Sequence, residues 1–178
     1  MKKFLSEFLQ AAGLVAFLFI TTAPPQTLPS RWEGDWKGDS KLTWVNGKIE
    51  DCAVELRISS IPNSNAKAWH LVYAFSDRKE VRDYELKPVD GSPGLFVIDE
   101  KNGFLIDNRL IDNAFYSQFT INGNLVTTRF ELQRDTILVE NTMFDIKNPR
   151  VTKLTGGQFE VSSFGMKYIQ RGTFIRQK

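Results

Sequence analysis

The stretch Cys52-Ala53-Val54-Glu55-Leu56-Arg57-Ile58 places apolar side chains at its even positions and charged ones at Glu55 and Arg57. A strand projects successive side chains to opposite faces, so this alternation is typical of a β-strand with one buried face. Alternating apolar positions recur at 69–75, 115–121 and 126–132. These runs predict a domain built from strands.

Turn signals separate the alternating runs. Asn-Gly pairs at 46–47, 102–103 and 122–123 supply residues that tolerate positive φ, as tight hairpin turns require. No helical pattern is evident from residue 31 onward. We expect about ten strands, the last of them divided in two around Gly165: 34–45, 49–60, 67–76, 80–88, 94–100, 103–111, 114–121, 124–133, 135–145 and 157–175.

Sequential short strands joined by short turns form a meander. A meander of this size exposes its edges unless it closes, and closure into a barrel removes them. The sequence therefore predicts an all-β domain, an up-and-down antiparallel β-barrel of eight to ten strands over residues 31–178. A barrel of this size encloses packed side chains or a cavity for one small ligand. The alternative, a Greek-key sandwich, needs longer crossover connections than the sequence offers.

Composition restricts the possible functions. The chain of 178 residues carries 23 Lys and Arg against 21 Asp and Glu, and this near-balance gives no reason to expect nucleic-acid binding. The single cysteine, Cys52, excludes an internal disulfide, and the single histidine, His70, excludes a His-paired zinc site. No nucleophile elbow or phosphate loop is present. We expect no catalytic residues, no metal and no cofactor.

The N-terminal residues differ from the rest of the chain. Lys2 and Lys3 precede an apolar run at 11–20, and small residues follow, as in a secretory signal peptide. An uncleaved membrane anchor and an amphipathic helix packed on the domain are the alternatives. We expect residues 1–23 to direct export to the periplasm or outside the cell, or to anchor the protein, with membrane contact only through this segment. The Pro-rich residues 24–30 are predicted to be a linker.

The ends of the domain carry a paired motif. Gly34-Asp35-Trp36-Lys37-Gly38 opens the first predicted strand, and Arg176 lies in the last one. This pairing resembles the calycin superfamily, which includes the lipocalins and fatty-acid-binding proteins. The resemblance implies that Trp36 seals one end of the barrel and that Arg176 lies across its indole ring, both as structural residues. Arg171 competes for that place, and the strand register decides between them.

Other families share parts of this pattern. The Gly-x-Trp-x-Gly element is similar to that of nitrobindin-like heme-binding barrels, in which a late histidine ligates the iron. This sequence has no histidine after His70, so the iron ligand is not carried over. Barrel lyases that attach bilins to phycobiliproteins also share the fold, but no motif in the sequence supports that assignment.

The turns of such a barrel alternate between its two ends. If Trp36 marks the closed end, the turns at 46–48, 77–79 and 101–103 surround the open mouth. Five of the six residues beside these turns are large and apolar enough to form an apolar entry for a lipid-like ligand. These six are Trp44, Ile49, Phe75, Val81, Ile98 and Phe104.

Polar residues on inward faces would mark a ligand pocket within apolar walls. Ser117 lies between Phe115 and Phe119, and Thr128 lies between Val126 and Phe130. We expect the ligand-binding residues to be Trp44, Phe75, Ile98, Phe104, Ser117 and Thr128.

Three functions remain open from the sequence. The first is non-enzymatic binding or carriage of a small hydrophobic ligand. The second is a ligand-free interaction or assembly module, which a Phe-packed interior and an exposed apolar patch would favour. The third is a barrel isomerase or lyase, which needs at least two titratable groups inside the cavity. The oligomeric state is left open.

Overall fold

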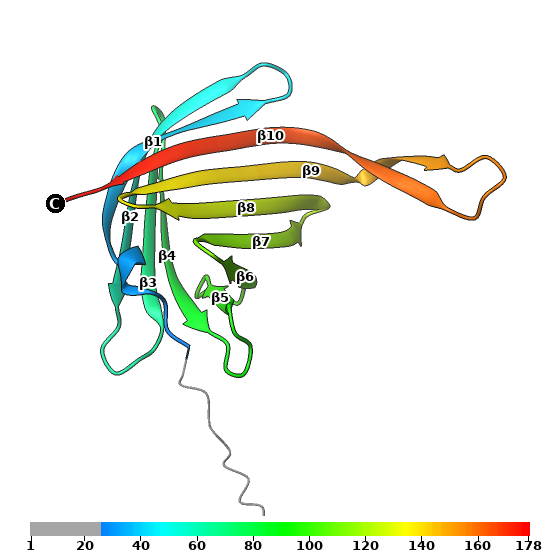
Figure 1. The fold of residues 1–178 in the computed structure, drawn as a ribbon. Helices are drawn as coiled ribbons and strands as arrows, with labels where there is room; N and C mark the ends of the chain where they lie inside the picture. Colours follow the sequence, from blue (N-terminus) through cyan, green and yellow to red (C-terminus); the bar gives the residue numbers. More distant parts are fainter. Residues whose placement is uncertain (1–25) are drawn as a thin grey trace, which may run out of the picture.

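Residues 26–178 are described by the computed structural model, and they form one closed antiparallel barrel of ten strands (Figure 1). Each strand pairs with its neighbours along the chain, and β1 closes the barrel on β10. The predicted all-β meander is thereby confirmed. The strands are β1 (Gly34–Trp44), β2 (Ile49–Ser60), β3 (Lys67–Ala74), β4 (Lys79–Pro88), β5 (Leu95–Asp99), β6 (Leu105–Ile111), β7 (Ala114–Ile121), β8 (Asn124–Gln133), β9 (Thr136–Lys153) and β10 (Glu160–Arg176).

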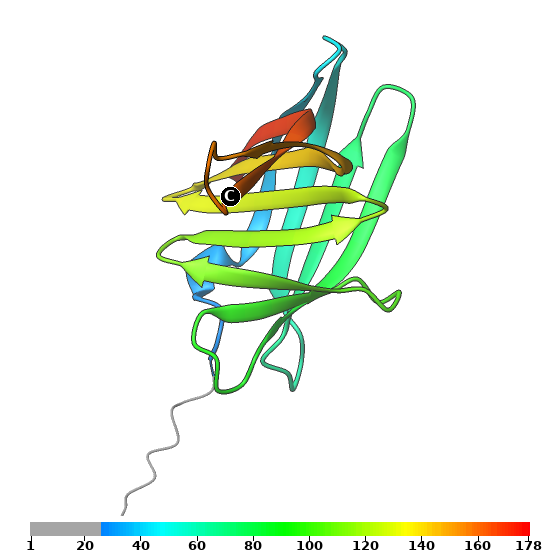
Figure 2. The same ribbon diagram turned by 90° about the vertical axis from the view of Figure 1, so that its right-hand side faces the viewer.

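The last two strands differ from their prediction. β9 continues to Lys153 instead of ending near 145, and β10 is one strand rather than two. Gly165 lies at a register shift within β10. A bulge of this kind bends a strand without ending it, so β10 is not divided there. The distal parts of β9 and β10 form a two-stranded arm, residues 146–164, that runs past the ends of β7 and β8 (Figure 1). In Figure 2 this arm points toward the viewer.

The chain enters the barrel through a short 3-10 helix, η1 (Ser30–Trp32). Leu28 and Trp32 are buried beneath the barrel, and the side chain of Gln26 bonds the backbone at Gly94 and Leu95. Residues 26–30 of the expected linker therefore pack against the domain. The expected signal or anchor, residues 1–23, lies outside the described residues. Among residues 26–178, no helix has the length and apolar character needed to cross a membrane.

The closed end of the barrel is built around Trp36. Its indole N–H donates to the carbonyl of Trp32 at 3.1 Å, and the Arg176 guanidinium carbon lies 4.0 Å from the centre of its ring. Arg176 also donates to the Glu33 carbonyl at 2.6 Å and to Asp135 at 3.0 Å. The register pairs Trp36 with Arg176, whereas Arg171 bonds Glu140 on the outer surface. One arginine thus ties both ends of the domain across a buried indole.

Each of the two glycines of the motif, Gly34 and Gly38, is required for a different structural reason. Gly34 has a φ of +136°, a conformation that side chains with a Cβ rarely adopt, and a Cβ there would lie 2.7 Å from the Arg176 guanidinium. A Cβ at Gly38 would lie 1.9 Å from the carbonyl oxygen of Thr173 on β10. Gly38 therefore permits the close approach of β1 and β10 that closes the barrel.

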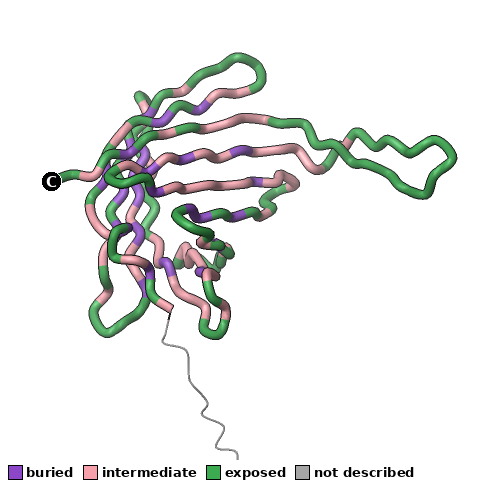
Figure 3. Tube along the Cα trace, in the orientation of Figure 1, coloured by how far each residue is buried: buried purple, intermediate pink, exposed green. Residues whose placement is uncertain are grey.

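The core is concentrated at this closed end. The largest fully buried side chains come from both termini and from the middle of the chain, and they pack under the barrel: Trp32, Trp36, Phe96 and Phe174. Buried positions alternate along the barrel strands, while the arm is exposed almost throughout (Figure 3). The closed end is thus a solid plug that leaves space only toward the mouth.

Replacing Trp36 with alanine should lower the free energy of unfolding by about 3–5 kcal/mol, the cost of deleting a large buried aromatic side chain. Arg176→Ala should cost less, and the double mutant should show coupling, because the two side chains are in contact. Urea melts measure both effects, with the exposed neighbour Ile175→Ala as control. A loss below about 1 kcal/mol for Trp36→Ala would show that the indole does not hold the floor together.

Candidate functional site

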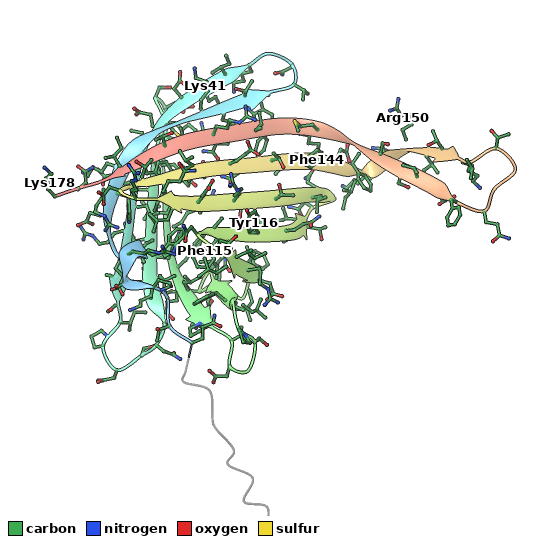
Figure 4. The ribbon with its side chains drawn as sticks, viewed as in Figure 1. Lys41, Phe115, Tyr116, Phe144, Arg150 and Lys178 are labelled. Atoms are coloured by element: carbon green, nitrogen blue, oxygen red, sulfur yellow. The ribbon has the colours of Figure 1, made fainter. Side chains whose placement is uncertain are left out.

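A cavity of about 910 Å³ opens at the mouth end of the barrel. Its lining comes from the inward faces of strands around the barrel, because alternate residues of each strand point inside. Phe115 and Tyr116 on β7 show this alternation: Phe115 is buried inside, and Tyr116 is exposed outside (Figure 4). The size is within the usual range for small-molecule pockets, roughly 300–1,000 Å³.

The structure brings all six predicted ligand-binding residues to this cavity. The six are Trp44, Phe75, Ile98, Phe104, Ser117 and Thr128. Ile49 and Val81, the two other residues expected at the mouth, are exposed on the outer surface and do not line it. Both residues occupy outward-facing positions, because side chains alternate along a strand. Ile49 lies three residues before the inward-facing Cys52, and Val81 lies between the inward-facing Glu80 and Arg82.

Aromatic rings form the deep wall of the cavity. Trp69 lies edge-to-face with Phe115 and with Phe130, at centroid distances of 6.0 Å and 5.6 Å. Beneath them, the buried Trp32 ring meets Phe115 at 5.0 Å. Trp32 was not singled out from the sequence, because it precedes the first strand and shares no alternation with it. This wall offers a rigid apolar surface to the body of a ligand.

Two pairs of neutral polar side chains lie on the cavity wall. The hydroxyls of Ser117 and Thr128, which face each other across β7 and β8, are 2.5 Å apart. Asn141 on β9 donates to the side-chain oxygen of Gln170 on β10 at 3.0 Å. The Oδ1 atom of Asn141 and the indole N–H of Trp44 are buried without a partner among residues 26–178. Such groups usually find a partner in folded proteins, so this wall favours a ligand that carries polar groups.

Charged side chains enter the cavity near the mouth. Glu80 accepts hydrogen bonds from Arg78 at 3.2 Å and from Arg82 at 3.0 Å, and Arg82 also bonds the hydroxyl of Tyr84 at 3.3 Å. Glu100 lines the same region. The expected apolar entry is therefore only part of the mouth, which also carries charged side chains. Val81 was expected at the mouth because it is apolar, but it faces outward. The inward-facing residues of this segment are Glu80, Arg82 and Tyr84.

The surroundings of these groups determine their ionisation. Burial opposes the charged form of Glu80, but hydrogen bonds from Arg82 and Arg78 outweigh it and lower the pKa of its carboxyl. Burial also opposes the charge on Arg82, yet Tyr84, Glu80 and Tyr73 raise its pKa. Burial raises the pKa of Tyr73 and of Tyr84. Near neutral pH the cavity therefore holds an ionised arginine–glutamate cluster beside neutral phenols.

The other titratable candidates do not line this cavity. His70 is on the outer face of β3, 3.5 Å from Asp83, and Cys52 is buried on β2, opposite Ser40 on β1. Burial raises the pKa of the Cys52 thiol. Within residues 26–178, no cluster of three or more His, Cys, Asp or Glu side chains is arranged to hold a metal ion.

Comparison with known proteins shows likeness in fold. No family model matches the chain, and no curated protein matches it. The chain is similar to the solved structure of an S-type phycobiliprotein lyase from Guillardia theta, with a TM-score of 0.60 and 7% identity over 84% of this chain and 90% of that one. It is also similar to a protein of unknown function of the DUF3598 family from Nostoc punctiforme, with a TM-score of 0.56 and 12% identity.

That second alignment covers 86% of this chain and 50% of the Nostoc protein, so the chain spans half the length of that relative. At these identities the likeness concerns the fold alone. The likeness is consistent with the closed antiparallel barrel, and no family model establishes a superfamily.

Replacing Glu80 with glutamine should reduce stability more at about pH 7 than at about pH 3. The pKa of Glu80 is lowered from its ordinary value of 4.5 in the folded chain. Its ionised form therefore stabilises the fold above that value, and this contribution disappears as the pH falls through the folded pKa.

Urea melts at both pH values measure the difference. Glu140→Gln, which removes an exposed ion pair with Arg171, is the control and should show a smaller loss at neutral pH. An equal loss for Glu80→Gln at both pH values would contradict the assigned ionisation.

Proposed function

We propose that the barrel binds and carries a small amphiphilic ligand, with its apolar body against the deep aromatic wall and its polar group toward the mouth. The observation that carries this proposal is the cavity itself, about 910 Å³ of space above a solid floor. A barrel of this size normally fills its interior with side chains unless the space has a use. The fold of the structural neighbours is consistent with a ligand-holding barrel.

Arg82 is the side chain that best distinguishes polar from purely apolar ligands. It uses one nitrogen to bond Tyr84 and another to bond Glu80. A guanidinium carries five N–H groups, so it retains donors for a ligand acceptor such as a carboxylate or carbonyl. We therefore place the ligand's polar group beside Arg82. The Ser117 and Thr128 hydroxyls offer a second polar contact deeper in the cavity.

An enzyme acting on a ligand inside the barrel is the second candidate. Two observations favour it: titratable groups, among them Glu80, Glu100 and Tyr84, line the cavity, and one structural neighbour is named as a lyase. General acid–base catalysis works best when the pKa of the group is near the working pH. The pKa shifts of Glu80 and Tyr84 run away from neutrality, so binding without chemistry remains the first proposal.

The ligand-free assembly module is less consistent with this interior, because the barrel is not filled with phenylalanine. Export or N-terminal anchoring also remains a proposal, since it depends on residues 1–23.

Ser117→Trp should weaken ligand binding, because an indole at this inward position takes up cavity space and removes the Ser117 hydroxyl. The matched control is Gln118→Trp, on the exposed outer face of the same strand. We expect the wild type and the control to bind a dansylated undecanoic acid with enhanced fluorescence, and Ser117→Trp to bind at least about tenfold more weakly, the effect of losing about 1.4 kcal/mol. Thermal melts should show that both variants are folded.

Solvent extraction of the purified protein, followed by mass spectrometry, identifies any molecule that copurifies. Incubating that molecule with the protein separates the two candidates. If the molecule is recovered unchanged, the protein is a carrier, and if it is converted to a product, the protein is an enzyme. No fluorescence enhancement with the wild type, together with an empty extract, would remove both.

A further inference from the structure

The arm, residues 146–164, serves no purpose in closing the barrel or lining its cavity. β8 begins at Asn124, opposite Asp145 on β9, and β9 continues to Lys153 beyond that point. At roughly 3.3 Å per residue, the arm reaches about 25 Å past the wall. β1 reaches its mouth end at Trp44, opposite Tyr168 on β10, so the arm extends from the mouth end of the barrel. An exposed projection of this length needs a separate explanation.

The two faces of the arm differ in chemistry. Val161 pairs with Thr152, and the backbone of Leu154 bonds that of Phe159, so alternation places Leu154, Phe159 and Val161 on one face. These three side chains are 60–78% exposed. The opposite face carries Lys153 and Glu160, which form an exposed ion pair at 3.7 Å. The tip is therefore an amphipathic hairpin with an unpartnered apolar face.

The arm also carries an excess of cations, on both of its faces. The arm holds Lys147, Arg150 and Lys153 against one carboxylate, Glu160. Within residues 26–178, neither Lys147 nor Arg150 forms an ion pair. Arg150 extends from the arm at a distance from the barrel (Figure 4). The uncompensated charge is thus positive and lies next to exposed apolar side chains.

We infer that the arm docks on an anionic lipid bilayer, with Leu154, Phe159 and Val161 entering the boundary between headgroups and acyl chains. Apolar side chains combined with cations are the chemistry that binds such a surface. A stable protein interface engages about 20–30 residues on each side, which a narrow hairpin tip does not offer. A bilayer requires no matching shape, so a few side chains suffice to bind it.

Other exposed apolar residues lie at the same end of the barrel. Val45 and Ile49 flank the β1–β2 turn, and Phe104 and Leu105 flank the β5–β6 turn. Docking through the arm therefore turns the cavity mouth, rather than the plugged floor, toward the lipid. Membrane contact was expected only through residues 1–23, and the arm adds a second point of contact. This inference goes beyond the proposed function and stands whether or not a ligand occupies the cavity.

Flotation of the full chain with lipid vesicles tests the inference. We expect the wild type to bind vesicles of phosphatidylcholine with one third phosphatidylglycerol, and to bind less as salt is raised. The triple variant Leu154→Ser, Phe159→Ser, Val161→Ser should bind at least about tenfold more weakly, since each buried apolar side chain contributes to insertion. Replacing Lys147, Arg150 and Lys153 with glutamine should weaken binding by about fivefold per cation on anionic vesicles only.

Two matched controls carry the same chemistry elsewhere: Val151→Ser on the opposite face of the arm, and Ile175→Ser at the floor end. Both should bind as the wild type does. Every variant contains residues 1–25, so any contribution from them is common to all. Absence of wild-type binding, or equal binding by the wild type and the triple variant, would overturn the inference.

A change in the oligomeric state of the triple variant without loss of vesicle binding would instead assign the arm to pairing between copies of the chain, and would also overturn the inference. The dansylated undecanoic acid, measured without vesicles on the same variants, reports separately on the cavity. Arm variants should retain that binding, so failure of the docking inference and failure of the proposed function give different results.

Discussion

The pairing of β1 with β10 is the constraint on which the rest of the molecule depends. It joins segments from the two ends of the domain, and the barrel has no interior until it forms. The Arg176 guanidinium fixes this junction from three sides, through the Trp36 ring, the Glu33 carbonyl and the Asp135 carboxylate. The buried side chains at the closed end supply most of the core. The strands can therefore enclose an open cavity above them while the domain stays stable.

The interior above the plug is less favourable for stability than a filled one. Inward-facing Glu80 and Arg82 form a half-exposed ion pair at positions where apolar side chains would add burial, and ion pairs this open to solvent add little stability. Proteins accept such positions chiefly where they serve binding or catalysis. The division into a solid floor and a polar, open upper half is thus the structural basis for assigning function to the mouth end.

Alternation along single strands was sufficient to predict most of the fold. Each strand has one inward face, so Ser117 and Thr128 were correctly expected to face inside between large apolar neighbours. The pattern misled at 80–84, where the one apolar residue, Val81, faces outward and the charged ones face in. Trp32 and the β9 half of the arm escaped prediction for other reasons. Trp32 is positioned by contacts far along the chain, such as Phe115, and the segment around Asn148, Pro149 and Arg150 does not resemble a strand.

β10 is a single strand from Glu160 to Arg176, so it connects the arm, the cavity wall and the closed end of the barrel directly. Its distal end belongs to the arm, its middle supplies Tyr168 and Gln170 to the cavity, and its far end holds the floor. The register shifts at Ser163/Gly165 and Met166/Tyr168 lie between the first two parts. A movement of the arm relative to the barrel would therefore bend β10 at these bulges, where its ladder is irregular. Tyr168, which lies edge-to-face with Trp44 at 5.1 Å, is the first cavity residue that follows them along β10.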